Sequence, residues 1–475
     1  MITSISWKNV WRNRSRSLVV IIAITLGTIA GIFVAGLMNG WVNQRINAAI
    51  YTEVGHLKVQ NPKFLVNEEA KHSINNYSKI EAYLNNLKEV KAWSARSKIM
   101  AMASTARGNS GLILKGIDPE KDKLVSDVFD NILPNTGTYF ESKARLPQIL
   151  ISNKTAQQLK IKNYRIKDIT IDSLKKLEIP IESINKLEPI SNKRFITKKK
   201  FETAIKEVWT KTEIRKYAPA LLNTSAYFQP RAKITCSFTK TNGELGYQTY
   251  QVCGVYKTSN TMFDQMSAFV KHADLVPAAL LAENQFHEIS VIINDLDNLE
   301  SVTKEIQEKY SEASVMNWKQ LAPDAGMMSE FMTIYYYIIM GIIFFALAFG
   351  IINTMLMAIL ERVKELGMLM AIGMKKGKVF SMIMLETIFL TLTGSIIGMV
   401  LGALLIKITG KTGLNFSSVA EGFESFGWSS HVYPSIETSF FFGVTIMVIV
   451  IAIIASLVPA RKALKLKPIE ALRME

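Results

Sequence analysis

The chain has 475 residues, of which 49% are hydrophobic and 20% charged, so it has room for both membrane-spanning and soluble parts. Its two cysteines exclude a disulfide-rich scaffold and an all-cysteine zinc site, and its five histidines lack the spacing of a metal-binding pair on one helix. The formal net charge of +16 would favour nucleic-acid binding only if the basic residues gathered on one soluble surface.

A basic N-terminal segment precedes the first apolar run. Residues 1–17 carry one lysine and three arginines but no acidic residue, and Trp7 and Trp11 lie four residues apart. This pattern predicts an amphipathic helix at the cytoplasmic face of a membrane. The charge-free run from Ser17 to Gln44 is too long for a signal peptide and lacks an A-x-A cleavage site. We therefore expect an uncleaved first transmembrane helix over residues 18–40.

Residues 41–330 are expected outside the cytoplasm, and their pattern mixes strands with helices. Ala232 to Tyr256 predicts a β-hairpin that turns at Asn242-Gly243 or in the following Glu-Leu-Gly. In this hairpin Cys253 has the wrong strand parity to face Cys236, so we expect no disulfide between the two. The mixture of elements indicates an α+β domain or a pair of such subdomains.

Within this domain, residues 160–216 form a basic insertion. They hold 16 basic and 8 acidic residues, and this surplus equals the whole surplus of residues 41–330. The simplest interpretation is a solvated, partly helical insertion. The functional alternative is a basic face for anionic lipid headgroups or for a partner.

Three further apolar segments follow at residues 331–360, 379–407 and 436–459. The first has no charged residue, the second has only Glu386 and Lys407, and each is long enough to cross the hydrocarbon core, which takes about 20 residues. An external loop is expected over residues 408–435.

The predicted cytoplasmic segments, residues 1–17, 361–378 and the tail 460–475, hold 14 basic and 4 acidic residues. Such an excess on short connections sets the orientation of membrane helices, so most of the net charge reports topology and not nucleic-acid binding. The predicted fold class is a membrane α-helical protein with four transmembrane helices and a large α+β extracytoplasmic domain inserted between helices 1 and 2.

The connection over residues 361–378 predicts a short helix. Glu361 and Glu365 lie one helical turn apart, and apolar residues repeat at three and four positions from Leu366 onward. On pattern alone, a solvated loop helix whose charges only fix the topology is an equally good interpretation.

Small residues give this helix a second feature. Gly367 and Ala371 form a small-xxx-small pair, which would let another surface approach closely. Gly373 and Gly377 are expected to end the helix before the chain re-enters the membrane.

Three separated motifs resemble one family. They are the run ERVKELGMLMAIG from Glu361 to Gly373 with Glu386 early in the next span, the ending from Pro459 to Arg473, and the start from Trp7 to Val19. Together they resemble the ABC-transporter permeases that include lipoprotein-releasing, macrolide-export and FtsX-like proteins. The stretch GHLKVQNPKF, from Gly55 to Phe64, is most similar to the lipoprotein-releasing (Lol-type) branch.

The resemblance implies that residues 361–378 form a coupling helix that docks on a separate ATPase. It assigns ATPase coupling to Glu361, Arg362, Glu365, Leu366, Gly367, Ala371 and Gly373. Glu386 lies roughly 12 Å along the helix from Lys378, near the cytoplasmic interface, so we expect a structural tie to the coupling region and no proton transport.

The resemblance also implies the assembly and its place in the cell. We expect a permease subunit in the bacterial inner membrane, with both termini cytoplasmic, paired with a second permease copy or a related permease and with ATPase subunits. Release of lipoproteins, with a periplasmic carrier as a possible further partner, is the preferred function. Alternatives are a peptide or drug exporter and an FtsX-like regulator of cell-wall hydrolases.

No catalytic residue, metal site or cofactor is expected in this chain, and ATP and magnesium are assigned to the partner ATPase. The run from Gly373 to Val379 lacks the gap and the Ser/Thr of a P-loop, and Gly108 to Gly111 lacks the spacing of a nucleophile elbow. A hypothesis from another class is an ATP-independent membrane-anchored sensor or adhesion protein, in which residues 361–378 bind nothing.

Overall fold

The computed structural model describes residues 2–12, 14–134, 136–141, 145–177, 179–229, 231–416, 422 and 428–464. The chain divides into two compact units. The first comprises Met1–Gln44, Met327–Ala420 and Ser429–Glu475, and the second comprises Arg45–Gly326 and Glu421–Trp428.

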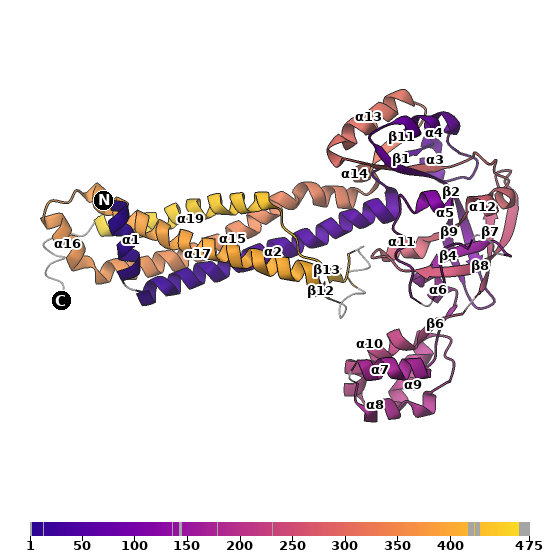
Figure 1. Cartoon of the computed structure of the whole chain (residues 1–475), viewed down its shortest axis with the longest axis horizontal. Coiled ribbons are helices and arrows are strands. Elements are labelled where there is room, and N and C mark those ends of the chain that lie inside the picture. Colours follow the sequence, from indigo (N-terminus) through magenta and orange to yellow (C-terminus); the bar gives the residue numbers. More distant parts are fainter. Residues whose placement is uncertain are drawn as a thin grey trace. The chain divides into compact units, whose positions relative to one another are not determined.

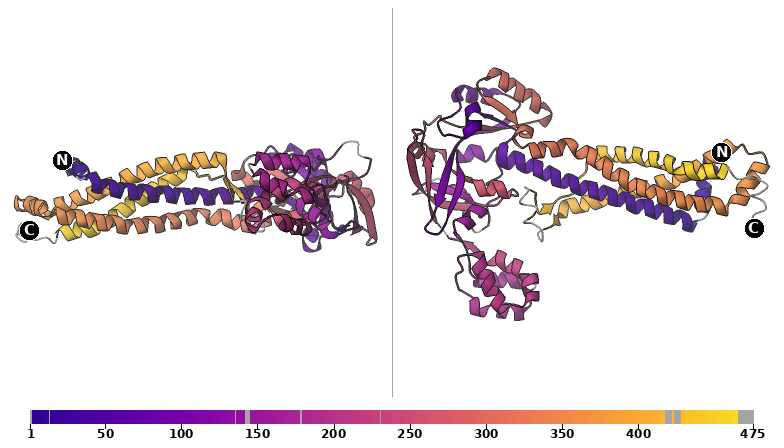
Figure 2. Two further views of the ribbon diagram at one scale, coloured as in Figure 1. Left: turned by 90° about the horizontal axis from the view of Figure 1, so that it is seen from below. Right: turned by 180° about the vertical axis from the view of Figure 1, so that it is seen from behind.

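The first unit is a helical bundle in which α2, α15, α17 and α19 lie alongside one another (Figures 1 and 2). Its elements are α1 (Ile2–Arg12), α2 (Arg14–Ala48), α15 (Pro323–Glu361), α16 (Val363–Ala371), α17 (Lys376–Thr412), α19 (Thr438–Leu464) and the strand pair β12 (Leu414–Asn415) and β13 (His431–Val432). Among the described residues, four stretches are long and apolar enough to cross a membrane: Ser17–Val54, Ile334–Glu361, Lys376–Thr412 and Thr438–Leu464. The predicted fold class is confirmed, with a large mixed domain between the first and second of these stretches.

A row of glycines brings α17 close to α2. A Cβ atom added at Gly398 would lie 2.7 Å from the Cβ of Thr28, and Gly394 and Gly402 are similarly close to neighbouring turns of α2. The Thr25 hydroxyl donates a hydrogen bond of 2.9 Å to the carbonyl of Gly394. Because small residues let helix backbones approach, this row fixes the pairing of two candidate spans.

The second unit is built on a mixed sheet with the strand order β11-β1-β10-β2-β3-β9-β4-β8-β7. Its strands are β1 (Leu57–Gln60), β2 (Val90–Ser104), β3 (Asn109–Ile117), β4 (Gln148–Ser152), β7 (Lys233–Thr239), β8 (Leu245–Tyr256), β9 (Ser267–Lys271), β10 (Glu288–Ile293) and β11 (Ser314–Asn317). The long strand β2 also pairs with β7, so the six strands from β2 to β7 in this order close into a ring.

Short helices surround this sheet. They are the π-helix η1 (Ala49–Val54), α3 (Pro62–Asn67), α4 (Tyr77–Asn86), α5 (Pro119–Asp122), α6 (Asn153–Gln158), α11 (Thr261–Met266), α12 (His272–Ala279), η3 (Leu296–Asn298), α13 (Leu299–Lys309) and α14 (Trp318–Leu321). One apolar core, with Leu57 and Val291, packs under α4 and α13, and a second, with Ile149 and Cys236, belongs to the ring. A further buried apolar cluster, with Leu150, Tyr256 and Phe269, lies on the same sheet.

The predicted hairpin is formed by β7 and β8. Gly243 adopts φ +84° in its turn, which agrees with the predicted Asn-Gly site. Cys236 and Cys253 are both free thiols, as strand parity predicts.

The basic insertion is a folded subdomain and not merely a solvated insertion. Its helices are α7 (Asp168–Lys176), α8 (Ile181–Asn185), η2 (Glu188–Ile190), α9 (Lys198–Val208) and α10 (Lys211–Ser225), and the paired strands β5 (Lys162–Tyr164) and β6 (Ala226–Phe228) close its neck. Leu174, Phe201 and Leu221 lie in a core of its own. The subdomain continues past residue 216, because burial of Leu221 extends α10 beyond the end of the basic run.

Candidate functional site

Helix α16 lies in the connection between the second and third candidate spans. It begins after Arg362, where the backbone leaves helical geometry at φ −103° and ψ 12°, and it ends at Ala371. Gly373 has φ +98°, which glycine adopts without steric cost, and the chain turns there toward α17. Gly377 lies in the first turn of α17, so its predicted role as a helix breaker is wrong.

One face of α16 packs inward against its own unit. Val363 and Leu366 are 4% and 3% exposed, within an apolar cluster that also contains Val379 and Ala460. Gly367 is buried as well. Leu366 and Gly367 therefore anchor the helix to the bundle and are not available on its surface.

The opposite face of α16 is open. Lys364, Met368, Ala371 and Ile372 are exposed, and the apolar side chains of Met368 and Ile372 are 54% and 76% exposed. Met368 and Ile372 are one turn apart and so lie on the same side of the helix. The predicted pair of small residues is therefore divided, with Gly367 inside and Ala371 on the open face.

A chain of charged side chains ties α16 to its neighbours. Arg12 of α1 makes two hydrogen bonds to Glu365, from Nη1 to Oε2 at 2.9 Å and from Nη2 to Oε1 at 2.5 Å. Arg362 donates from Nε to Glu365 at 3.2 Å and from Nη1 to both Glu386 oxygens at 3.1 and 3.3 Å. The structure thus joins three predicted site residues, Arg362, Glu365 and Glu386, through one continuous network.

The Glu365 carboxyl has opposing influences on its pKa. Burial raises the pKa, but hydrogen bonds and charge from Arg12 and Arg362 outweigh this effect and leave the pKa of Glu365 below its usual value of 4.5. Glu365 is therefore held as a carboxylate, which keeps both arginines attached.

Helix α1 belongs to this site, a role that sequence reasoning did not give to its side chains. The Ser6 hydroxyl donates to the Met382 carbonyl at 3.1 Å, and the ring of Trp7 meets that of Phe389 edge to face at 5.6 Å. The only sequence signal for Arg12 is a basic helix with no acidic residue of its own. Its partner Glu365 is 353 positions away, beyond any local pattern.

Two hollows flank this arrangement. A polar cavity of about 260 Å³ is lined by residues that include Arg12, Glu361, Arg362 and Glu386. A larger and mainly apolar hollow of about 630 Å³ is lined by Thr3, Ile5, Leu369, Ile372, Gly373, Met374, Lys378 and Met382. Glu361 and Gly373, both predicted site residues, therefore line the two hollows beside α16.

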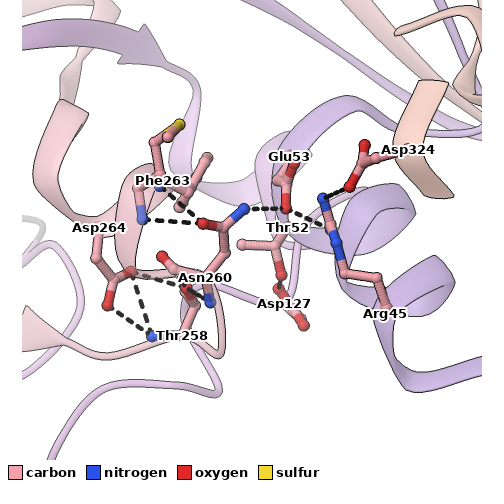
Figure 3. A network of polar contacts seen from close by, with 10 residues as sticks. Arg45, Thr52, Glu53, Asp127, Thr258, Asn260, Phe263, Asp264 and Asp324 are labelled. Carbon is pink, nitrogen blue, oxygen red and sulfur yellow. Dashed lines mark hydrogen bonds and ion pairs between the residues drawn. The ribbon is translucent and has the colours of Figure 1, made fainter. Parts of the chain in front are cut away.

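A second polar network fastens the domain ends of α2 and α15 (Figure 3). Arg45, near the end of α2, donates at 2.9 Å both to Glu53 of η1 and to Asp324 of α15. The side chain of Arg45 is only 6% exposed. One buried guanidinium thus links the roots of two long helices.

This network continues into the loop after β8 and into α11. Glu53 also accepts 2.7 Å from the amide of Asn260, whose own oxygen accepts from the backbone N–H of Met262 and caps α11. The buried carboxylate of Asp264 then accepts 2.8 Å from Thr258 (Figure 3). No pattern in the sequence marks these residues, because their partners come from three separate stretches, residues 45–53, 258–264 and 324.

The helical part of the chain is similar to known permeases. Residues 337–468 match the FtsX-like permease C-terminal family. The chain is 29% identical over 232 residues to the uncharacterized ABC transporter permease MJ1507 of Methanocaldococcus jannaschii, and 26% identical over 237 residues to the uncharacterized ABC transporter permease YknZ of Bacillus subtilis. Each match covers 48% of this chain and 55% of the relative, so the chain spans about half the length of these relatives.

A shorter match has a higher identity. The chain is 37% identical over 128 residues to the macrolide export ATP-binding/permease protein MacB of Chlorobaculum tepidum, over 26% of this chain and 17% of that protein. The match to the FtsX-like family includes α16 and the candidate spans α17 and α19. Residues 337–468 are therefore similar to the FtsX-like permease C-terminal family, and about half of the chain is similar to ABC transporter permeases.

Proposed function

We propose that this chain is the permease subunit of an ABC transporter and that α16 is the helix on which a separate ATPase docks. The observation that carries the proposal is the division of α16 within the FtsX-like domain. Val363 and Leu366 are buried in the chain's own core, whereas the apolar side chains of Met368 and Ile372 are 54% and 76% exposed. Burying such a pair against a partner gives roughly 1.5–3 kcal/mol for each side chain.

In this proposal the ATPase supplies the energy and the chain transmits motion. A displacement of α16 reaches α1 through Glu365 and Arg12, and it reaches α17 through Arg362 and Glu386. The glycine row of α17 carries it on to α2 by close backbone contact. ATP and magnesium are bound by the ATPase, and this chain works as a non-catalytic lever.

The assembly follows the family expectation. Two permease copies, or this chain with a related permease, pair with two ATPase subunits in the bacterial inner membrane. The termini and α16 face the cytoplasm, because the segments 1–17, 361–378 and 460–475 carry most of the surplus positive charge.

The proposed substrate is a lipoprotein released from the inner membrane toward a periplasmic carrier, based on the segment Gly55 to Phe64, which forms β1 and the start of α3. Export of a macrolide or another small molecule is an equally supported second candidate, because several relatives are named macrolide export proteins. Reconstitution with the ATPase distinguishes them by whether ATP releases a labelled lipoprotein or moves a macrolide.

Replacing Met368 and Ile372 together by Glu tests the docking surface. Loss of two apolar contacts should weaken binding of the ATPase at least about 100-fold in co-purification from detergent. The matched control replaces two similarly exposed apolar residues of the insertion, Ile169 and Leu177, by Glu and should bind normally. Equal retention of the ATPase by both variants would show that it does not dock on Met368 and Ile372. Absence of any ATPase from the purified wild type would favour the ATP-independent sensor or adhesion protein.

Single cysteines in a Cys-free background test the orientation. Cysteines at Lys199 and Asn415 should react with a membrane-impermeant thiol reagent in intact cells with a permeabilised outer membrane, and one at Lys376 should not. Labelling at Lys376 would place α16 outside and remove any contact with a cytoplasmic ATPase.

A further inference from the structure

The strand ring of the second unit carries a pocket of about 650 Å³ that the proposed function does not use. Its floor crosses three neighbouring strands. Lys233 of β7 lies opposite Gln251 of β8, which in turn lies beside Gln148 of β4. Residues paired directly across strands share a face of the sheet, so a row of polar side chains forms the floor.

One wall of the pocket is fastened to this floor. The backbone N–H of Thr138 donates 3.0 Å to the carbonyl of Cys253, and the side chain of Gln148 accepts 2.8 Å from the N–H of Glu141. Gly137 has φ +137°, and a Cβ atom there would lie 1.9 Å from the Cys253 oxygen. Because only glycine permits this approach, the wall is built against the floor and the pocket is formed in advance of any ligand.

The pocket has a surplus of positive charge. Arg145, Arg231 and Lys233 line it, against the single carboxylate of Glu141. Across the described part of the chain, no ion pair or side-chain hydrogen bond joins any of these three cations to another residue. Three cations with no partner among the described residues, gathered around one hollow, attract an anionic group.

The lining is also partly apolar. Leu146, Phe228 and Val252 border the same hollow as the cations. A volume of about 650 Å³ is in the range that holds a molecule of drug size, well beyond a single inorganic ion. The occupant that satisfies both parts of the lining has an anionic head and a short apolar portion.

We propose that this pocket is a binding site for an anionic amphiphile with a phosphate-bearing headgroup. The headgroup is held by Arg145, Arg231 and Lys233, and the apolar portion lies against Leu146 and Phe228. The proposal does not depend on the ATPase, because every residue that carries it belongs to the second unit.

Calorimetric titration of the full chain in a non-ionic detergent tests this site with three probes: dihexanoyl phosphatidylglycerol, dihexanoyl phosphatidylcholine and inorganic phosphate. The anionic lipid should bind at least about tenfold tighter than the zwitterionic one, because it keeps a net charge for the cations. The double variant Arg231→Gln with Lys233→Gln should lose at least about tenfold in affinity for the anionic lipid. The control Lys199→Gln with Lys200→Gln, which removes two exposed charges from α9, should change it less than about twofold.

The opposite results have definite meanings. Equal loss of affinity in both double variants would mean that the lipid is attracted by the overall positive charge and not by this pocket. Equal affinity for the two lipids would mean that the pocket does not select an anion. Competition by inorganic phosphate at the same concentration as the lipid would assign the cations to the free ion and overturn the amphiphile.

A measurement on the unchanged chain keeps the test independent of how the variants fold. Cys253 lines the pocket, whereas Cys236 is fully buried. Burial raises the pKa of the Cys253 thiol to about 12, so its alkylation by N-ethylmaleimide is slow and is followed over hours. The anionic lipid should slow it at least about threefold, and an unchanged rate at saturating lipid would contradict occupancy of this pocket.

Discussion

Two arginines, Arg45 and Arg362, each join two carboxylates from different helices, yet their surroundings differ. Arg45 holds Glu53 and Asp324, both at 2.9 Å, and its side chain is 6% exposed. Arg362 holds Glu365 at 3.2 Å and Glu386 at 3.1 Å, with 23% of its side chain exposed. The guanidinium group therefore bridges two carboxylates in a buried environment at Arg45 and in a partly solvent-exposed one at Arg362.

The difference separates a fixed joint from an adjustable one. A buried charge that loses its partner cannot be rehydrated, so the geometry around Arg45 is strongly enforced. Water reaches Arg362 and competes with its ion pairs, so rearrangement there costs less. A helix that has to meet a moving partner suits the second environment, and the root of a long helix in a folded domain suits the first.

The comparison predicts its largest effect at the buried arginine. Arg45→Met leaves Glu53, whose side chain is 16% exposed, without its cation and should destabilise the second unit by about 3 kcal/mol. Tryptophan fluorescence during urea unfolding of the full chain measures this loss. Arg107→Met, which removes an exposed arginine from the same unit, should change stability by less than about 0.5 kcal/mol. Equal losses of stability in the two variants would mean that the ion pairs of Arg45 do not hold the two helix ends together.

A smaller loss of stability is expected at Arg362, with a larger loss of coupling. Arg362→Met leaves the Glu386 carboxylate, 9% exposed, without its donor, at a cost of about 1–3 kcal/mol. Substrate-stimulated ATP hydrolysis by the reconstituted complex should fall at least about tenfold, while Arg45→Lys, which keeps the buried charge, should retain more stimulation. Full stimulation with Arg362→Met would show that motion does not pass through Glu386.

The exposed end of the same network should contribute least. Arg12 and Glu365 are 62% and 39% exposed, so Arg12→Gln should cost less than about 1 kcal/mol, and added salt should reduce the difference. The pKa of Glu365 is lowered by its arginines, so the stability it contributes is present above pH 4.5 and is lost as the pH falls through the lowered value. Unfolding of wild type and Arg12→Gln should therefore converge in acid, and a difference that grows in acid would refute this pairing.

Removing the insertion should have the smallest effect on the rest of the protein, because its core is separate from both arginines. Replacing residues 165–225 by a short Gly/Ser linker between β5 and β6 should leave membrane insertion, ATPase binding and the unfolding of the remaining domain unchanged. Replacing only residues 165–215 by the same linker should lower the amount of protein that accumulates. This shorter replacement keeps the end of α10 but removes the core that buries Leu221. If the variant with residues 165–215 replaced accumulates as well as the one with residues 165–225 replaced, the end of α10 is not an integral part of the subdomain.

Local pattern was sufficient for the elements whose signal lies within a single stretch. The four candidate spans follow from run length and hydropathy, α16 from its three-and-four repeat between two spans, and the β7–β8 hairpin from strand alternation around Gly243. The reduced state of Cys236 and Cys253 likewise follows from parity along two neighbouring strands.

What the sequence alone determined about this protein is which segments enter a membrane, which is helical between them, and the family they resemble, because length, charge and period are properties of consecutive residues. Only the tertiary structure decided that Gly367 is buried while Ala371 is open, that Arg12 pairs with Glu365, and that Arg45 joins Glu53 to Asp324. Arg12 and Glu365 lie 353 positions apart in the sequence, and Arg45 and Asp324 lie 279 positions apart. Such pairings are fixed by the packing of distant helices and strands, and no periodicity along the chain records them.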